Sequence, residues 1–468
     1  MSENRAAPPP SAPRFERYRE YRESGVGWLG EIPAHWEAKR TKFAATLRSG
    51  HTPSRQKAEY WQDCTIPWFS LADVWQVRDG RVEYVHETAE KISEIGLANS
   101  SARLLPEGTV VLSRTASVGF SAILGGDMAT TQDFVNWVCG PSLRPEYLLY
   151  VFRAMGPEFR RLTMGSTHQT IYMHDVGGFS TPVPPVPEQD QIVAFVRKEI
   201  GRIDALVANQ ERLINLLREK RTALISDAVT RGLDPDAPMW DSGHEWLGDV
   251  PEGWKVLPLK RLALIRYGLG EPPPELSDGL PLIRATDISN GRIAASGIRR
   301  IDPKQIPRDR EVRLEADDII VVRSGAYTGD SAIVPKALEH AIAGYDMFMR
   351  VRNAAPKFIA WALLSRPVLN SQIDLMRARA AQPHLNAEEL ASVMIAVPPL
   401  DQQAAIVLFL DRSVARIEEA VAKVDEAIGQ LREYRTALIS AAVTGKIDVR
   451  NHRDGRTVTD LGQPGLML

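Results

Sequence analysis

Side chains that commonly carry catalysis do not occur in this chain at the spacings their chemistry needs. The nine histidines form no His-x-x-x-His pair and no Cys/His cluster with zinc-ligand spacing. Thr444-Gly445-Lys446-Ile447 lacks the upstream glycine and the hydroxyl of a phosphate-binding loop. The proline pairs 184–185 and 398–399 lack the preceding polar residue of an adenine-methyltransferase motif, and Glu37-Ala38-Lys39 lacks the Pro-Asp pair of a nuclease motif. The sequence therefore predicts a chain without catalytic machinery of its own.

Length and composition describe an ordinary globular protein. The 468 residues suffice for two to four domains, at about 100–200 residues each. The net charge of -2 is not the basic balance typical of a nucleic-acid-binding domain, so local patches or a partner must attract any phosphates. Two cysteines, Cys64 and Cys139, favour a reducing compartment. No apolar run reaches the roughly 18 residues of a membrane span, and we expect a cytoplasmic protein.

The chain repeats itself. Residues 24–36 return as 242–254, and residues 184–234 return as 398–448 without a gap. The densest shared stretch, Arg-Thr-Ala-Leu-Ile-Ser, begins at Arg221 and again at Arg435. The period of roughly 215 residues far exceeds the ~20–50 residues of solenoid repeats. Each repeat is therefore a whole domain plus a long helix, and two equivalent halves suit a target that also has two halves.

The two long helices carry apolar residues in steps that alternate between three and four, which is typical of a coiled-coil seam. Helix one should begin after the proline-rich stretch 182–187 and end near Thr230; helix two should begin after residues 397–400 and end at Gly445. Antiparallel pairing would bury both stripes, give a pseudo-two-fold axis and place one domain at each end. About 42 residues would make a rod of about 63 Å. A generic coiled-coil spacer would show the same periodicity.

The sequence of each variable region predicts short strands with Gly/Pro turns, followed by helical segments at 145–161 and 357–366. We therefore predict an α+β (mixed α/β) fold, with apolar β-branched strands at 109–113 and 318–322. The expected order is a disordered tail (1–23), domain one (24–183), helical region one (184–234), domain two (242–397), helical region two (398–448) and a second tail (449–468).

The order of motifs, given twice, resembles the DNA specificity subunit of type I restriction-modification systems over nearly the whole chain. Residues 49–74 are similar to the opening of that family's target recognition domain, and residues 110–119 to its central strand and loop. Residues 184–189 and 218–225 resemble its conserved helical regions. The second domain departs from the opening pattern, because Tyr267-Gly268-Leu269-Gly270-Glu271-Pro272-Pro273 replaces Gly-His-Thr-Pro.

The resemblance implies a non-catalytic chain that binds double-stranded DNA, two adenine-N6 methyltransferase subunits and restriction (translocase) subunits. Each domain would read half of a bipartite site, and the helices would set the spacer and dock the methyltransferase subunits. No cofactor is expected in this chain. S-adenosylmethionine would belong to the methyltransferase partner, and ATP with Mg²⁺ to the restriction partner. Two alternatives are a coiled-coil protein–protein adaptor that never touches DNA and a single-chain restriction–methylation enzyme, which the missing catalytic motifs disfavour.

Candidate DNA-contacting residues are polar side chains on the matched loops, because Arg or Lys pairs with guanine and Asn or Gln with adenine. In the first domain they are His51, Thr52, Arg55, Lys57, Arg114, His168 and Gln169. In the second they are Arg284, Arg323, Tyr327, Arg377, Arg379, Gln382 and His384. Arg114 and Arg323 share one position after a buried strand, where a structural ion pair is the alternative. Shared positions also suit phosphates, which position a protein without reading sequence.

The repeated Arg221-Thr222 and Arg435-Thr436 pairs are the candidates for partner binding. Both arginines fall on apolar-stripe positions, so an arginine paired with an acid at the bundle end is the structural alternative. Two copies of one docking surface for the methyltransferase subunits would explain why the stretch is duplicated.

Overall fold

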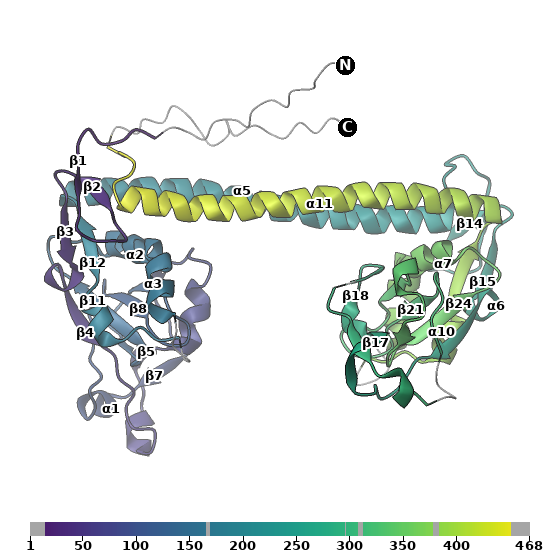
Figure 1. Ribbon diagram of the computed structural model, residues 1–468, viewed down its shortest axis with the longest axis horizontal. Coiled ribbons are helices and arrows are strands. Elements are labelled where there is room, and N and C mark those ends of the chain that lie inside the picture. The colour runs from purple at the N-terminus through teal and green to yellow at the C-terminus, as the bar shows by residue number, and fades with distance from the viewer. Residues whose placement is uncertain (1–14, 165–168, 295, 308–311, 378–382, 451–468) are drawn as a thin grey trace. The chain divides into compact units, whose positions relative to one another are not determined.

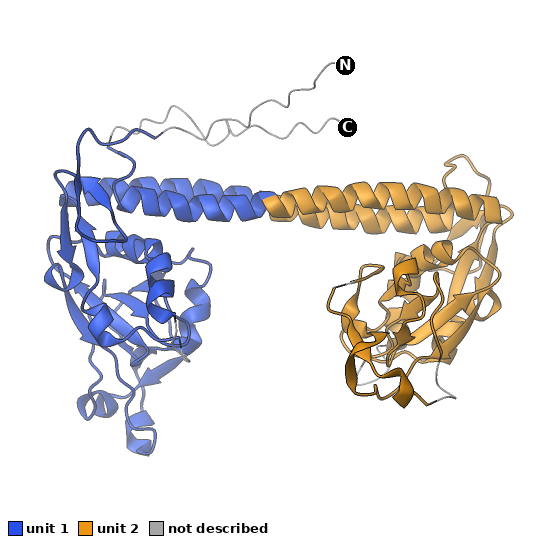
Figure 2. Ribbon diagram, viewed as in Figure 1, with its two compact units in different colours: residues 1–209, 427–468 blue, residues 210–426 orange. Residues whose placement is uncertain are grey.

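The computed structural model describes residues 15–164, 169–294, 296–307, 312–377 and 383–450. The chain forms two compact units, shown in Figure 2. Unit 1 holds residues 1–209 and 427–468, and unit 2 holds residues 210–426. Each unit contains one variable domain and a part of both long helices, α5 (Val186–Arg231) and α11 (Leu400–Val443).

The domain of unit 1 is built on a five-stranded sheet in the order β4-β11-β8-β9-β6, labelled in part in Figure 1. A three-stranded sheet, β10-β5-β7, and the pairs β1-β2 and β12-β3 complete it. The strands are β1 (Tyr21–Glu23), β2 (Glu31–Pro33), β3 (Glu37–Arg40), β4 (Ala45–Ser49), β5 (Ile66–Phe69), β6 (Tyr84–Val85), β7 (Glu90–Ile92), β8 (Val110–Ser113), β9 (Ser121–Leu124), β10 (Ala129–Thr130), β11 (Phe134–Cys139) and β12 (Ser180–Val183). The helices are η1 (Thr41–Phe43), η2 (Ala58–Trp61), η3 (Leu71–Val77), α1 (Glu94–Ala98), α2 (Pro145–Ala154), α3 (Gly156–Thr163) and α4 (Met173–Val176).

Unit 2 repeats this plan with a four-stranded sheet, β16-β24-β21-β22, beside β20-β17-β23 and the pairs β15-β25, β13-β14 and β18-β19. Its strands are β13 (Met239–Asp241), β14 (Asp249–Pro251), β15 (Lys255–Pro258), β16 (Ala263–Tyr267), β17 (Glu275–Ile283), β18 (Ile288–Ser289), β19 (Arg292–Ile293), β20 (Arg299–Ile301), β21 (Ile319–Val321), β22 (Ser331–Ile333), β23 (Ile342–Ala343), β24 (Met347–Val351) and β25 (Met394–Val397). Its helices are α6 (Leu259–Leu262), η4 (Ala285–Asp287), η5 (Pro303–Gln305), η6 (Lys336–Leu338), α7 (Pro356–Leu363), α8 (Arg366–Val368), the π-helix η7 (Leu369–Ile373), α9 (Asp374–Arg377) and α10 (Ala387–Ser392).

The predicted mixed α/β fold is confirmed. The two apolar β-branched runs form the central strands β8 and β21, and every residue of both strands is buried. The helical patches predicted after them correspond to α2 with α3 and to α7 with α8. No helix within the described ranges is long and apolar enough to cross a membrane.

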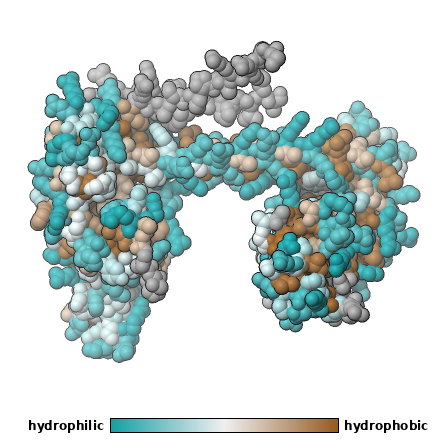
Figure 3. Space-filling model, in the orientation of Figure 1, coloured by the Kyte–Doolittle hydropathy of each residue, from teal (hydrophilic) through white to brown (hydrophobic). Residues whose placement is uncertain are grey.

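Within each unit, the parts of α5 and α11 run antiparallel and bury the predicted stripe, as the side-by-side helices in Figure 1 illustrate. In unit 1, Asp204 of α5 lies 3.3 Å from Arg435 of α11, whereas Glu188, earlier in α5, lies 4.0 Å from Arg450, beyond the end of α11. In unit 2, Ile225 and Leu410 belong to one core cluster that extends into the domain. The visible faces of both helices are mostly hydrophilic (Figure 3). Burial of each large apolar side chain stabilises such packing by about 1.5–3 kcal/mol.

Both long helices begin at the residue directly after a proline pair, and a buried glutamine ties each start to its domain. Helix α5 begins at Val186, inside the stretch expected to precede it, because proline is accepted in a first turn. The Gln189 Nε2 donates to the carbonyl of Pro184 at 2.8 Å, and its Oε1 accepts from the amide of Arg144 at 2.8 Å. Gln403 repeats both bonds with Pro398 and Ala355. The sequence repeat at this point therefore encodes a domain–helix junction.

Ordered structure in unit 1 begins inside the segment expected to be a tail. Strand β1 pairs with β2, and the Tyr21 hydroxyl donates to the carbonyl of Gly445 at 2.8 Å. The amide of Asp448 donates to the carbonyl of Glu16 at 2.7 Å. The N-terminal segment thus packs on the end of α11, and this burial corrects the tail boundaries of 1–23 and 449–468. Unit 2 achieves the same packing through the continuous chain that follows α5.

The glycine after each long helix makes that packing possible. Gly445 has φ +71, and a Cβ there would lie 2.3 Å from Pro33 Cδ. We expect Gly445→Ala to destabilise the protein by about 2–4 kcal/mol, because it combines left-handed strain with a clash against a rigid ring. Gly429→Ala is the matched control, since nothing lies within 4 Å of its Cβ position and alanine favours a helix interior. Thermal and urea unfolding check both variants; equal stabilities would contradict the packing described.

Candidate nucleic-acid interface

Three of the predicted residues of unit 1 meet where strands β4, β8 and β11 connect to loops. The Thr52 hydroxyl donates to Oε1 of Gln132 at 2.6 Å, and Arg114 Nε donates to the carbonyl of the same glutamine at 3.1 Å. The carbonyl of Gln169 accepts from the amide of Ala116 at 3.0 Å. Thr52, Arg114 and Gln169 therefore belong to one loop cluster at the end of the sheet.

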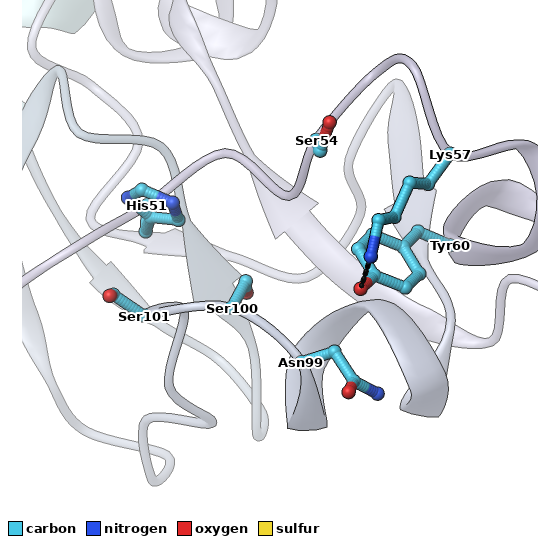
Figure 4. Close-up of a pocket in the computed structure, with 7 residues that line it drawn as sticks. All are labelled: His51, Ser54, Lys57, Tyr60, Asn99, Ser100 and Ser101. Carbon is cyan, nitrogen blue, oxygen red and sulfur yellow. Dashed lines mark hydrogen bonds between the residues drawn. The ribbon is translucent and has the colours of Figure 1, made fainter.

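His51 and Lys57 line a second feature of unit 1, an open polar pocket of about 430 Å³. Figure 4 shows its lining, which also includes Ser54, Tyr60, Asn99, Ser100 and Ser101. Lys57 Nζ donates to the Tyr60 hydroxyl at 3.0 Å, and this hydrogen bond raises the pKa of Lys57. Hydroxyls beside a fixed ammonium group suit phosphate or base oxygens. Sequence reasoning missed the serines, which carry no distinguishing pattern.

Arg55 lies near this pocket but already has partners. Its guanidinium carbon is 4.1 Å from the ring centroid of Trp61, and its Nη2 is 2.7 Å from a carboxylate oxygen of Glu90. The side chain is 58% exposed. Arg55 is therefore held in one orientation, with part of its charge neutralised.

In unit 2, four predicted residues surround the loop that follows β21. This loop begins at Arg323 and carries Tyr327, whose side chain is about half exposed. Arg377 Nη1 donates to the carbonyl of Thr328 at 3.1 Å. His384 forms a strand-like bridge with Ser324. The structure thus brings residues far apart in sequence to one surface.

Two tyrosines that sequence reasoning missed flank Arg323. Its guanidinium carbon lies 4.6 Å from the ring centroid of Tyr267 and 4.3 Å from that of Tyr345. These rings are 46% and 50% exposed. A signal was available for Tyr267, because it begins the segment where the second domain departs from the pattern of the first.

Arg284 lies beside the segment that carries Tyr345, since a Cβ at Gly344 would be 3.7 Å from Arg284 Cγ, but Arg284 already has partners. It follows β17 and forms a bidentate pair with Asp287, at 3.2 and 3.0 Å, which raises the pKa of Arg284. It also lines a pocket of about 480 Å³ with Arg299 and Arg300. The remaining candidates, His168, Arg379 and Gln382, lie outside the described residues. Across the described ranges, no three His, Cys, Asp or Glu side chains gather as metal ligands.

Comparison with known proteins identifies the family. The type I restriction modification DNA specificity domain matches residues 33–215 and 251–424, which cover one domain and most of one helix in each repeat. The chain belongs to this specificity-domain family.

Individual relatives of this chain are named as type I specificity subunits. The chain is 25% identical to the type I restriction enzyme MjaIX specificity subunit of Methanocaldococcus jannaschii, over 59% of this chain and 63% of that protein. It is 21% identical to the EcoKI specificity subunit of Escherichia coli K12, over 89% of this chain and 90% of that protein. A solved structure described as showing complex assembly and conformational transition of the type I R-M system shares the fold, with a TM-score of 0.66 at 16% identity, covering 88% of this chain and 98% of that one.

The duplicated arginines of this specificity-domain protein join each domain to the helices. Arg221 Nε lies 3.7 Å from Glu418, and its Nη2 donates to the carbonyl of Asn290 at 2.8 Å. Arg435 Nε lies 3.3 Å from Asp204, and its Nη2 donates to the carbonyl of Gly80 at 2.7 Å. Their side chains are only 13% and 14% exposed. The two pairs are the acid-paired arrangement that the sequence left as the alternative to partner docking.

The two backbone carbonyls that accept from these arginines belong to residues with similar backbone conformations. Asn290 and Gly80 both have positive φ, +52 and +68, and belong to loops of their own domains. Burial lowers the pKa of Arg221, and the nearby Glu418 opposes that shift. The neighbouring Thr222 and Thr436 hydroxyls donate to carbonyls one turn earlier in their helices, at 3.1 Å each. A role of these four residues in partner binding stays a prediction.

The arginine junctions can be tested separately in each unit. We expect Arg221→Met to raise amide hydrogen exchange around residues 288–293 only, and Arg435→Met around residues 77–81 only. The loss of a buried charge-assisted bond should lower the local opening free energy by about 1–3 kcal/mol. Arg→Lys at each position is the control, because it keeps the charge without the planar fork. Unchanged exchange in both loops would contradict this role.

Proposed function

We propose that this chain is the non-catalytic DNA specificity subunit of a type I restriction-modification complex. The observation that carries the proposal is the duplication of a whole recognition unit, since each copy presents Arg, Lys, His, Tyr or Gln side chains on loops at the end of its sheet. Each unit would read one half of a bipartite DNA sequence. The matching family and the specificity subunits among its relatives support this reading.

The mechanism we propose is positioning. The two units hold the duplex so that a partner methyltransferase can flip an adenine out of the stack, at an unstacking cost of a few kcal/mol. S-adenosylmethionine would be bound by two adenine-N6 methyltransferase subunits, and ATP with Mg²⁺ by restriction subunits. Such a complex would work in the cytoplasm, where its DNA is. The near-neutral chain suggests that partners supply part of the phosphate attraction.

The proposal predicts one methylated bipartite motif. A genome-wide map of N6-methyladenine should lose that motif when this gene is deleted and regain it on complementation. The map would give both half-sites and the spacer together. Unchanged methylation, with the partner methyltransferase expressed, would contradict the specificity role.

Salt dependence then separates DNA recognition from a protein adaptor. The complex should bind its motif with an affinity that falls steeply and linearly on a double-logarithmic plot against salt, because phosphate contacts release counterions. An adaptor would show neither this slope nor a preference for the motif.

The helices should set the spacer length. Deleting residues 210–216 and 424–430 removes one heptad from each helix near the boundary of the two units and keeps the apolar stripe in phase. Seven residues span about 10 Å, close to three base pairs, so the recognised spacer should shorten by about three pairs or recognition should be lost. Methylation mapping of the variant gives the result. An unchanged spacer would exclude a ruler role.

A further inference from the structure

The arginine after the central strand is present in both units, but its guanidinium has different partners. In unit 1, Arg114 donates to the carbonyls of Gln132 and Ile171, at 3.1 and 3.4 Å. These two bonds join separate loops of the same domain. Arg114 is therefore a positioning residue, with Nε and Nη1 already used by the protein.

In unit 2, the guanidinium of Arg323 does not join loops through hydrogen bonds to backbone carbonyls. Its guanidinium lies between the rings of Tyr267 and Tyr345, and its buried Nε has no hydrogen-bond partner. Its backbone amide donates to Asp346 at 3.2 Å; burial raises the pKa of Asp346, and the nearby charge of Arg323 opposes that shift without a side-chain hydrogen bond. Within the described ranges, no ion pair involves Arg323. An arginine fork that makes no protein hydrogen bond lies at the surface where DNA is expected.

The tyrosine stack is specific to unit 2 and fixed in place. Tyr267 ends strand β16 opposite Met347, at the ladder position that Ser49 occupies in β4. The hydroxyl of Tyr267 accepts from the amide of Ala387 at 2.9 Å. A serine cannot stack on an arginine, so unit 1 lacks this feature. Holding the ring in advance lowers the entropic cost of using the guanidinium for binding.

A guanidinium that is stacked on aromatic rings keeps its in-plane N–H groups for hydrogen bonds through its edge. Guanine offers a matching planar pair of acceptors, O6 and N7, in the major groove. A phosphate also offers two oxygens. However, the DNA backbone is the same in both half-sites, so a phosphate contact would favour the same residues around the arginine in both units. Because the guanidinium has different neighbours in the two units, a contact with a base is favoured over a contact with a phosphate.

We propose that Arg323, held between Tyr267 and Tyr345, reads a guanine in the half-site of unit 2. This inference rests on the proposed DNA specificity function and adds the base class and the residue.

The first test maps N6-methyladenine in cells that carry the complex with wild-type chain, Arg323→Lys or Arg350→Lys. Arg323→Lys keeps the charge but loses the fork, so one guanine of one half-site should become degenerate while the other half-site is unchanged. Arg350→Lys is the matched control in the same sheet, because its guanidinium is already paired with Asp318 at 3.0 and 2.8 Å. The control should leave the motif unchanged.

The second test uses the wild-type complex and needs no variant to fold. Oligonucleotides carry 7-deazaguanine, which lacks the N7 acceptor, at each guanine of the half-site in turn. One position should lose about tenfold to a hundredfold in affinity, and Arg323→Lys should abolish that difference. A half-site without guanine, or a uniform loss across sequences with a shallower salt slope, overturns the assignment to a base. A wild-type complex without any bipartite motif overturns the proposed function as well.

Discussion

The narrow apolar stripe on each long helix is the constraint on which the rest of the structure depends. A lone helix of more than 40 residues would expose that stripe to water along its whole length. Antiparallel contact buries it, and the direction of the chain then determines which segments share a unit. The first part of α5 meets the last part of α11 in unit 1, and the converse holds in unit 2. Each domain is consequently supported by both repeats of the sequence.

The two repeats retain both the stripe and the helix starts. Along the stripe, Ile203, Val207 and Ile214 return as Ile417, Val421 and Ile428, because both helices fill the same seam. A junction between helix and domain needs defined donors and acceptors. Gln189 and Gln403 each bridge a proline carbonyl and a domain amide. The indoles of Trp36 and Trp254 likewise donate to the side chains at the helix starts, Glu188 and Gln402. Polar bonds of this kind are costly to leave unmade, which favours retention of the same residue types.

The sequence allowed prediction of the parts governed by periodicity and local chemistry. Helices, central strands, fold class and family followed from stripes, β-branched runs and the order of motifs. The start of α5 was predicted wrongly because proline is accepted in a first helical turn. The extent of the N-terminal tail was predicted wrongly because it depends on contacts between distant segments, such as Tyr21 with Gly445. Among the site residues, the loop cluster around Arg323 could be predicted from matched positions. The flanking Tyr345 could not, since only the folded ladder brings it beside the arginine.

The comparison of Arg114 with Arg323 suggests how one fold can serve two different half-sites. Both arginines occupy one backbone position after a buried strand, so their identity alone does not specify a base. What differs is the neighbours: carbonyls bind the first guanidinium, while aromatic rings leave the edge of the second available. Under the proposed recognition of guanine, changing one neighbour, as from Ser49 to Tyr267, would alter the donors available to DNA while the ladder position in the sheet stays the same. Specificity can therefore change in the loops and strand ends while the junctions that hold each domain on the helices stay constant.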